Sequence, residues 1–321
     1  MINKLNPVFF LVFLLLLSCQ NDNDDNEKPE TNTLLTPDTA VSYQEFIKQN
    51  YQVFPMPLPN ELVFCGDKIP LNRSHVRENL DREILVNTYW HSNTFLYQKR
   101  SKRWFPFIEK ILTREGVPAD LKYLALIESG LTDVVSPAGA TGFWQFMDGT
   151  GKDYGLEITE YVDERYHIEK STVAACKYLK RAYKEFGSWP LAAASYNMGK
   201  GALSKVLKKQ KVDSYFDLHL NKETSRYVYR ILAAKLILEN SENFGFYFRK
   251  QDGYLPYATK TLSVDTTIND LAQFSIDQGI NYQILRLLNP WIINYSLPNK
   301  EGKTYYILIP KNSSKENDDA I

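Results

Sequence analysis

One glutamate in this sequence occupies a position where helical periodicity predicts an apolar side chain. Leu121, Leu124 and Ala125 mark one apolar helix face, and the next position on that face, seven residues after Leu121, is Glu128. Gly130 then ends the predicted helix. The sequence therefore predicts a carboxylic acid on the inner face of a helix end. Burial there would keep the acid protonated, so that it can donate a proton to a glycosidic oxygen.

A loop rich in serine, proline and glycine follows and ends on Trp144 and Gln145. An acid that faces a loop with polar and aromatic groups is the composition expected of a sugar-cleaving site. The alternative for Glu128 is a solvated side chain at a frayed helix end, because glutamate is rarely fully buried. The alternative for Trp144 is a place in the core.

Two aspartates, Asp133 and Asp148, lie close enough in the sequence to supply a second carboxylate, which most glycosidases use. Both also fit turn-forming aspartates that hydrogen-bond to nearby backbone. The four histidines show no ligand spacing, and no G-x-S-x-G, Walker or H-E-x-x-H motif occurs. We therefore expect neither a cofactor nor a metal site.

Helices predicted from apolar periodicity surround the Glu128 stretch. The strongest carries Val173, Cys176 and Leu179 at helical spacing and closes at Gly187. No stretch before residue 255 alternates strongly at period two, so the predicted fold class is mainly α. The expected helical ranges are 104–116, 167–187, 189–201, 204–209 and 222–240.

Two flanking regions differ from this centre. Residues 41–104 look helical but show no chemistry, so we interpret them as a packing collar. Residues 259–311 begin with a β-branched run, continue with two short helical patterns and end on a β-rich segment. That order predicts a small, separate βααβ module.

Composition excludes some partners. The 321 residues are 44% hydrophobic and 13% aromatic, which suits a globular protein with a substantial core. Lys+Arg and Asp+Glu both number 38, so no net field favours nucleic acid. Cys65 and Cys176 could pair in an oxidising compartment, but the helical pattern around Cys176 favours a small buried apolar residue.

The first residues have the layout of an export signal. Lys4 precedes an apolar run, Val8–Leu17, that is too short to span a bilayer in the usual way. The run leads into Ser18-Cys19, and Leu16-Leu17-Ser18-Cys19 resembles the lipobox of bacterial lipoproteins. The resemblance implies lipidation of Cys19, and an ordinary signal peptide with an incidental cysteine is the alternative. We expect a cell-envelope protein anchored to a membrane, with the periplasmic face of the outer membrane favoured.

Three motifs occur in the order of one known family. They resemble the signatures of the soluble lytic transglycosylase domain, and the likeness covers residues 107–240 or so. The resemblance implies a lysozyme-like (α+β) fold and cleavage of the β-1,4 bond between N-acetylmuramic acid and N-acetylglucosamine in peptidoglycan. The muramyl C6 hydroxyl would close onto C1 and leave a 1,6-anhydro end. The motifs are Ile127-Glu128-Ser129, Ser136-Pro137-Ala138-Gly139-Ala140-Thr141-Gly142-Phe143-Trp144-Gln145 and Ala194-Ser195-Tyr196-Asn197-Met198-Gly199.

The same resemblance implies roles for individual residues. Glu128 would be the single acid and base, Ser136 would hold the substrate's acetamido group, and the Tyr196 hydroxyl would lie near the carboxyl. Glu223 we interpret as structural. Glycan strands are the implied partner, and no protein partner is indicated. The residues implied to bind or frame the sugar are Ser129, Ser136, Gly142, Gln145, Tyr196, Asn197 and Tyr227.

The C-terminal module resembles a LysM repeat through TTINDLAQF, LLNPW and the ILIP ending. It departs from that pattern at Val264-Asp265-Thr266-Thr267, which replaces the usual glycine-aspartate turn. A degenerate sugar-binding repeat and a small domain that only packs on the enzyme therefore remain alternatives.

For the whole chain, two other functions stay open beside lytic transglycosylase: a lysozyme-type muramidase and a non-catalytic wall-binding lipoprotein. The expected division of the chain is a lipoprotein signal peptide (1–18), a disordered tether (19–41), a helical N-terminal region (42–106), the catalytic domain (107–250), the LysM-like module (251–311) and a disordered tail (312–321).

Overall fold

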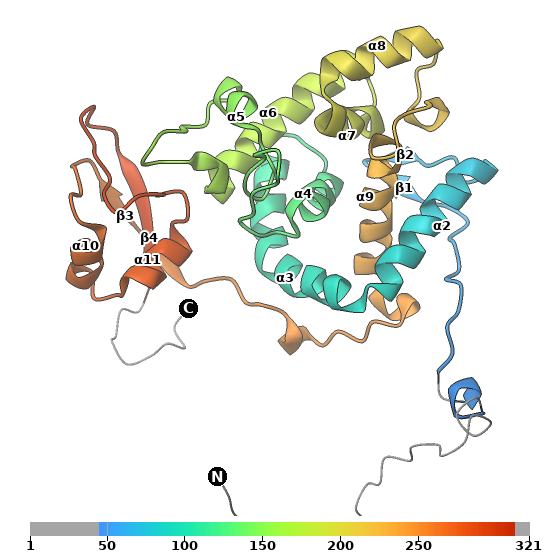
Figure 1. Cartoon of the computed structure of the whole chain (residues 1–321), viewed down its shortest axis with the longest axis horizontal. Helices are drawn as coiled ribbons and strands as arrows, with labels where there is room; N and C mark the ends of the chain where they lie inside the picture. The colour runs from blue at the N-terminus through green and yellow to red at the C-terminus, as the bar shows by residue number, and fades with distance from the viewer. Residues whose placement is uncertain (1–44, 50, 312–321) are drawn as a thin grey trace, which may run out of the picture. The chain divides into compact units, whose positions relative to one another are not determined.

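The computed structural model describes residues 45–49 and 51–311 (Figure 1). The predicted signal peptide, the lipidation site at Cys19, the tether and the C-terminal tail lie outside the described residues. The chain divides into two units between Phe54 and Pro55, and the second unit holds all the elements discussed below. No helix among the described residues is both long and apolar enough to cross a bilayer.

The second unit is mainly α with two small antiparallel sheets, so the predicted fold class is confirmed. The predicted order of the C-terminal module, strand–helix–helix–strand, is also confirmed. The elements in chain order are β1 (Val63–Phe64), β2 (Asp67–Lys68), α2 (Ser74–Tyr89), α3 (His91–Arg114), η1 (Ala119–Leu121), α4 (Lys122–Ser129), α5 (Asp148–Asp153), η2 (Glu164–Tyr166), α6 (Ile168–Phe186), α7 (Trp189–Met198), α8 (Lys200–Gln210), η3 (Tyr215–Asp217), α9 (Thr224–Glu239), η4 (Ser241–Phe244), η5 (Lys250–Asp252), β3 (Thr259–Val264), α10 (Leu271–Asp277), α11 (Tyr282–Leu288) and β4 (Tyr305–Pro310).

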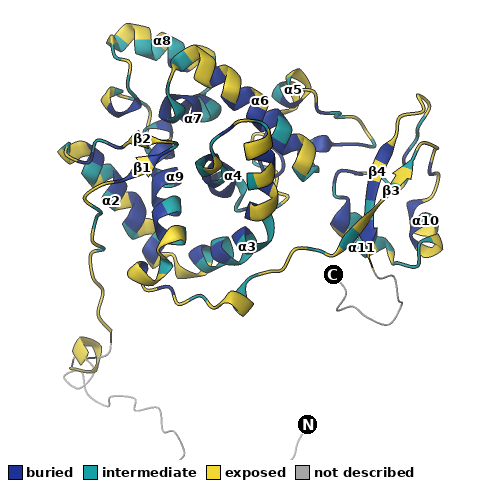
Figure 2. Ribbon diagram, turned by 180° about the vertical axis from the view of Figure 1, so that it is seen from behind, coloured by how far each residue is buried: buried dark blue, intermediate teal, exposed yellow. Residues whose placement is uncertain are grey.

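The core lies where α2, α3, α4, α6, α7 and α9 meet. These helices turn their buried faces inward, whereas α8 is largely exposed and buries only Leu203 (Figure 2). Helix α6 behaves as its periodicity predicts, because Cys176 and Leu179 are fully buried and Gly187 ends the helix in the left-handed conformation. Cys176 and Cys65 are both free thiols.

Helix α3 differs from the sequence interpretation. It runs for 24 residues and continues through Pro106, whereas the sequence suggested a collar that ends there and a short helix that follows. Proline removes one backbone hydrogen bond and usually breaks a helix, but packing of the flanking residues Phe105 and Ile108 in the core outweighs that loss. Phe107, next to the proline, is exposed.

The collar packs on the rest of the helical core through α2, which lies along α9 (Figure 1). Val76, Leu80 and Ile84 of α2 are fully buried. A charge pair also crosses this contact. The Arg226 guanidinium on α9 donates from Nε to Glu83 Oε1 (2.7 Å) and from Nη2 to Glu83 Oε2 (3.1 Å), and the Glu83 side chain is only 2% exposed.

The C-terminal module has its own small core beneath the β3–β4 sheet, in which Thr259 pairs with Pro310 and Val264 with Tyr305. It is joined to the loop before α6 by backbone hydrogen bonds, from Asp163 N to Trp291 O (2.8 Å) and from Ile293 N to Tyr161 O (2.9 Å). The module therefore packs on the helical part of the chain, and sugar binding by the module stays a prediction.

We predict that Glu83→Gln lowers the free energy of unfolding by about 2 kcal/mol, less than the loss of a fully buried pair because Arg226 is partly exposed. The urea midpoint measures this effect. Lys68→Gln, which breaks the exposed Lys68–Glu61 pair, is the control and should leave the midpoint unchanged. Equal midpoints for both variants would contradict a structural role for the buried pair.

Candidate active site

The Glu128 carboxyl lies in the last turn of α4. Leu121, Leu124 and Ala125 are fully buried, as the stripe predicts, and Glu128 is partly buried at the end of that stripe. Gly130 ends the helix in the left-handed conformation (φ 62°), and its N–H donates to Leu126 O (2.8 Å). The chain turns away directly after the carboxyl, which leaves the acid at the boundary between the core and the following loop.

Helix α9 supplies the partner of this acid. The fully buried Tyr227 donates its hydroxyl hydrogen bond to Glu128 Oε1. Three residues further on, Arg230 Nη2 donates to Ile127 O (2.9 Å), which fixes the end of α4 against α9. The structure thus brings together two predicted site residues, Glu128 and Tyr227, that lie about a hundred positions apart.

The environment favours the protonated acid. Burial raises the pKa of Glu128 above its usual value, and the negative charge of Glu223 raises it further. The Tyr227 hydrogen bond and the Arg230 charge act in the opposite direction but do not cancel the effect of burial. Burial and the Glu128 charge also raise the pKa of Tyr227 well above its usual value, so its hydroxyl remains a hydrogen-bond donor.

Asn197 positions Glu223 at the start of α9. The Asn197 Nδ2 donates to Glu223 Oε1 (2.9 Å), and the Thr224 hydroxyl donates to Asn197 Oδ1 (2.7 Å). Both polar ends of this predicted sugar-binding side chain therefore have protein partners. Asn197 acts on Glu128 through Glu223, a relation that no local sequence signal indicates.

Tyr196 joins α7 to the end of the loop. Its hydroxyl donates to Trp144 O (2.8 Å), and burial together with the Glu128 charge raises its pKa well above the usual value. Trp144 is fully buried and donates from Nε1 to Thr172 Oγ1 (2.8 Å), so the core alternative for Trp144 holds. The Tyr196 ring therefore supports the loop on the same side as the acid.

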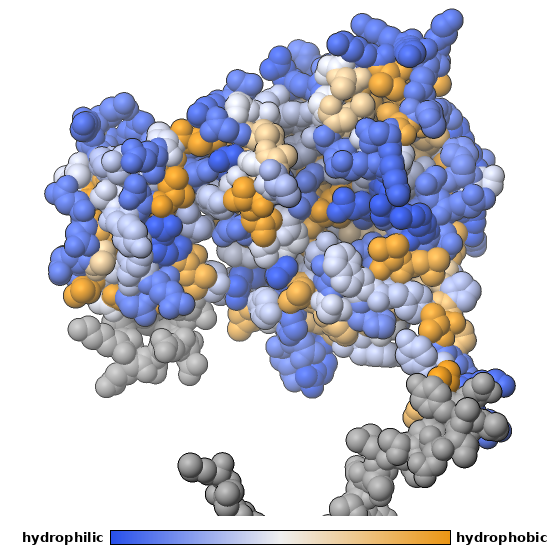
Figure 3. Space-filling view, viewed as in Figure 1, coloured by the Kyte–Doolittle hydropathy of each residue, from blue (hydrophilic) through white to orange (hydrophobic). Residues whose placement is uncertain are grey.

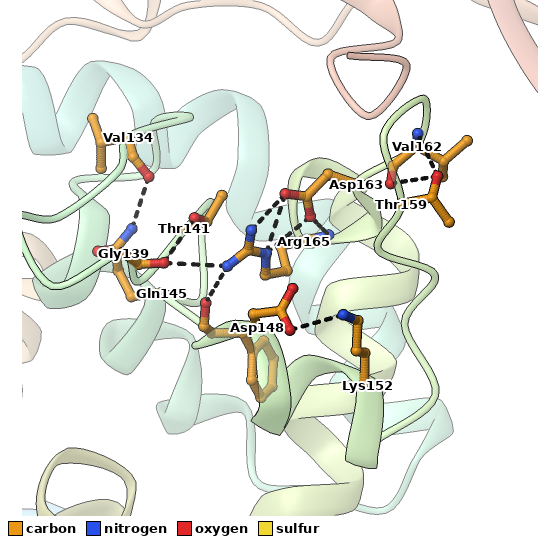
Figure 4. A network of polar contacts seen from close by, with 11 residues as sticks. Val134, Gly139, Thr141, Gln145, Asp148, Lys152, Thr159, Val162, Asp163 and Arg165 are labelled. Carbon is orange, nitrogen blue, oxygen red and sulfur yellow. Dashed lines mark hydrogen bonds and ion pairs between the residues drawn. The ribbon is translucent and has the colours of Figure 1, made fainter. Parts of the chain in front are cut away.

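The loop folds back on itself as a tight structure. Ser136 N donates to Ala140 O (2.8 Å), and Ala140 N donates to Ser136 Oγ (3.0 Å). Gln145 has a positive φ of 48°, and its Nε2 donates to Val134 O (3.0 Å) and Gly142 O (2.9 Å) (Figure 4). The amide Oε1 of Gln145 thus remains the polar atom of that side chain available to a ligand.

Arg165 holds this loop in place, and sequence reasoning missed it. Its guanidinium forms a two-pronged pair with Asp163 (Nη2 to Oδ2, 2.7 Å) and donates from Nη1 to Gly139 O and Phe146 O, both at 3.2 Å (Figure 4). The Asp163 hydrogen bond and charge raise the pKa of Arg165. The carbonyls that Arg165 binds lie 26 and 19 residues earlier in the chain, so no local pattern indicates the contact.

Two further predicted residues have structural partners. Ser129 Oγ donates to Phe143 O (2.9 Å) and accepts from Leu131 N (3.1 Å), so it ties α4 to the loop. Gly142 lies where the loop crosses the Arg165 backbone, and a Cβ added there would stand 2.2 Å from Arg165 O. Direct sugar contacts by these two residues stay predictions.

A cavity of about 730 Å³ opens beside the loop and α7. Three predicted site residues, Gln145, Tyr196 and Asn197, line it. Its other lining residues are Phe146, Met147, Thr150, Asp153, Tyr154, Tyr178, Arg181, Met198, Gly199, Lys200 and Gly201.

Asp148 and Asp133, the two candidates for a second carboxylate, do not line this cavity, and neither does Glu128. Asp148 forms an ion pair with Lys152 (2.9 Å) in the first turn of α5, in keeping with its structural interpretation (Figure 4). Asp133, whose pKa is raised to about 6 by burial, lines a different cavity between α3 and the C-terminal module. No group of three or more metal-binding side chains occurs among residues 45–49 and 51–311.

We predict that Gly142→Ala destabilises the protein by about 3 kcal/mol, because its Cβ would overlap a backbone carbonyl and its φ of 77° is unfavourable for alanine. Gly139→Ala is the matched control: its φ is 86°, nothing lies within 4 Å of the added Cβ, and we expect a loss of about 1 kcal/mol. Thermal unfolding of both variants measures the difference. Equal losses would contradict a close crossing at Gly142.

Comparisons with known proteins match two stretches of the chain. The Transglycosylase SLT domain family matches residues 105–218, and the Soluble lytic transglycosylase C-terminal LysM-like domain family matches residues 260–313. The chain is 28% identical over 257 residues to Membrane-bound lytic murein transglycosylase D of Escherichia coli (strain K12), covering 77% of this chain and 55% of the relative. This chain therefore spans little more than half the length of that protein.

Two other proteins are similar over shorter stretches. A Putative tributyltin chloride resistance protein of Alteromonas sp. (strain M-1) is 27% identical over 129 residues, covering 40% of this chain and 62% of the relative. The X-ray structure of an inactive mutant of Lytic Transglycosylase Slt from Pseudomonas aeruginosa is 21% identical, with a TM-score of 0.36 over 46% of this chain and 26% of that chain.

The first family match spans Glu128, the loop held by Arg165 and the Tyr196–Asn197 pair, and the second spans the βααβ module. Residues 105–218 of the chain are therefore similar to transglycosylase SLT domains, and residues 260–313 to the LysM-like C-terminal domain of soluble lytic transglycosylases.

Proposed function

We propose that this protein is a peptidoglycan lytic transglycosylase in which Glu128 acts as both acid and base. The observation that carries the proposal is the partly buried Glu128 side chain, whose pKa is raised by desolvation while Tyr227 donates to its carboxyl. A raised pKa favours the protonated form that a general acid needs. The SLT domain match and the murein transglycosylase relative support peptidoglycan as the substrate class.

The proposed reaction needs no second carboxylate. Glu128 donates its proton to the glycosidic oxygen, the bond from that oxygen to muramyl C1 breaks, and positive charge grows at C1. The muramyl C6 hydroxyl then attacks C1 and gives its proton to the Glu128 carboxylate. One proton moves out and one returns, no water is consumed, and the product carries a 1,6-anhydro end.

The carboxylates near the site favour this route over hydrolysis by a muramidase. A hydrolase uses a second carboxyl group as a nucleophile or base. Asp148 is paired with Lys152, and Glu223 is held by Asn197. Asp133 and Asp153 line cavities that do not include Glu128. Ser136 and the free Oε1 of Gln145 are proposed to contact the acetamido sugar.

We further propose that Cys19 is lipidated and anchors the enzyme to a membrane of the cell envelope, the periplasmic face of the outer membrane being favoured. Support comes from the Leu16–Cys19 sequence and from the relative's name, which describes that protein as membrane-bound. Labelling with a radioactive fatty acid would test it: incorporation is expected in the wild type and should be absent in Cys19→Ala.

Digestion of purified sacculi tests the activity. We predict fragments with 1,6-anhydromuramyl ends by mass spectrometry, and a rate for Glu128→Gln that is lower by a factor of about 10³, the scale of acid–base catalysis. Ends that have gained water would instead establish the muramidase. Equal fragment release by Glu128→Gln and wild type would overturn the role of Glu128.

The pH dependence of kcat/KM provides a second test. Because the Tyr227 hydrogen bond lowers the pKa of Glu128 and Glu223 raises it, Tyr227→Phe should move the alkaline limb to higher pH and Glu223→Gln should move it to lower pH. Tyr229→Phe, on the same helix without a contact to Glu128, is the control. Shifts in the same direction for both variants would contradict Glu128 as the titrating acid.

A further inference from the structure

The cavity beside the loop contains charged groups that the proposed reaction does not use. Arg181 of α6 and Lys200 at the start of α8 line it, together with a single carboxylate, Asp153 of α5. Among the described residues, none of these three side chains takes part in an ion pair. Two positive side chains and one negative side chain therefore give the lining of the cavity a formal net charge of +1.

The Lys200 ammonium is held in a defined place. It donates to the Tyr154 hydroxyl (3.2 Å) and lies 5.4 Å from the centre of the Tyr178 ring. An ammonium has three donors, and a single acceptor is used here, so two N–H groups remain for a ligand.

Three tyrosine rings connect this cation to the part of the cavity that Gln145 and Tyr196 line. Tyr154 packs on Tyr178 with ring centres 5.4 Å apart, and Tyr178 packs edge-on against Tyr196 at 5.0 Å. Tyr196 in turn bonds to the Trp144 carbonyl, next to Gln145. A glycan that reaches Gln145 and Tyr196 would therefore extend over an aromatic floor toward Lys200 and Arg181.

The surroundings of the cavity are also basic. Helix α8 carries Lys205, Lys208 and Lys209 on its exposed surface, and Figure 3 shows a hydrophilic surface over this helix. These lysines do not line the cavity. They add a general attraction for anions, whereas Lys200 and Arg181 can make direct contacts.

We propose that Lys200 and Arg181 form a subsite for the carboxylate carried by the muramyl residue of a glycan strand. The inference rests on the proposed function, because it takes the glycan strand as the ligand. N-acetylated sugar rings are neutral, so the anionic group that distinguishes a muramyl residue is the carboxylate of its lactyl ether or of the peptide stem. Arginine and lysine are the side chains that bind carboxylates by charge-assisted hydrogen bonds.

Asp153 should have the opposite effect on carboxylate binding to that of Lys200 and Arg181. Its negative charge lies in the same cavity and repels a bound carboxylate. Removing that charge should strengthen binding, whereas removing the charges of Lys200 and Arg181 should weaken it. A merely structural role for these residues would not produce opposite effects.

Binding is measured in the Glu128→Gln background, so that strands remain intact. The first ligand is a glycan strand freed of peptide stems, which bears the lactyl carboxylate. The second is the same strand with that carboxylate converted to a neutral methylamide. The third keeps its peptide stems. Calorimetry gives the affinity of each, and thermal unfolding confirms that each variant is folded.

We expect the acidic strand to bind about tenfold more tightly than the methylamide strand, the equivalent of one charged contact. Lys200→Gln with Arg181→Gln should abolish this difference, and Asp153→Asn should enlarge it. Lys205→Gln with Lys208→Gln removes the same charge from the exposed face of α8 and should preserve it.

The ligands also identify the source of the carboxylate. An effect of Lys200→Gln with Arg181→Gln on the stem-free strand assigns the lactyl group, and an effect confined to the stem-bearing strand assigns the stem. An unchanged preference in both cases overturns the proposal. Because no turnover is needed, a failure of the proposed lytic reaction in the sacculus assay would leave this binding test intact.

Discussion

The carboxyl group of Glu128 is withdrawn from water and still accepts a hydrogen bond, and the rest of the site depends on that combination. Tyr227 can reach the acid only because α9 packs on α4, a contact that Arg230 locks through the Ile127 carbonyl. Helix α9 is in turn held by α2 of the collar. The collar thus helps to hold Tyr227 in contact with the Glu128 carboxyl.

A second group of polar contacts determines the shape of the cavity wall. Arg165 connects Gly139, midway along the loop, to Phe146 after Gln145, and Ser129 and Tyr196 attach the loop to α4 and α7. Many side chains expected to bind sugar have such internal partners. Side chains that are already fixed by their neighbours lose little conformational entropy when a ligand binds. That saving favours binding through the few polar atoms that have no protein partner, such as Gln145 Oε1.

Helices and strands with a clear hydrophobic periodicity were predictable from the sequence. The tertiary contacts between them were not. The stripe from Leu121 to Glu128, the α6 helix and the βααβ order all follow from local pattern. Helix α3 was divided wrongly at Pro106, because the core contacts that carry the helix past proline come from distant segments. Arg165 and Arg230 were missed for the same reason: each binds backbone carbonyls, which any sequence supplies.

The contact between α2 and α9 has a consequence for how the chain acquires its structure. Helix α2 ends at Tyr89, and its main partner begins at Thr224, so the two pair across well over a hundred intervening residues. Closure over that span carries a large entropic cost, and it must wait until α9 has been synthesised. During that interval Val76, Leu80 and Ile84 remain uncovered, and the nascent chain is open to aggregation or to chaperones at this apolar face.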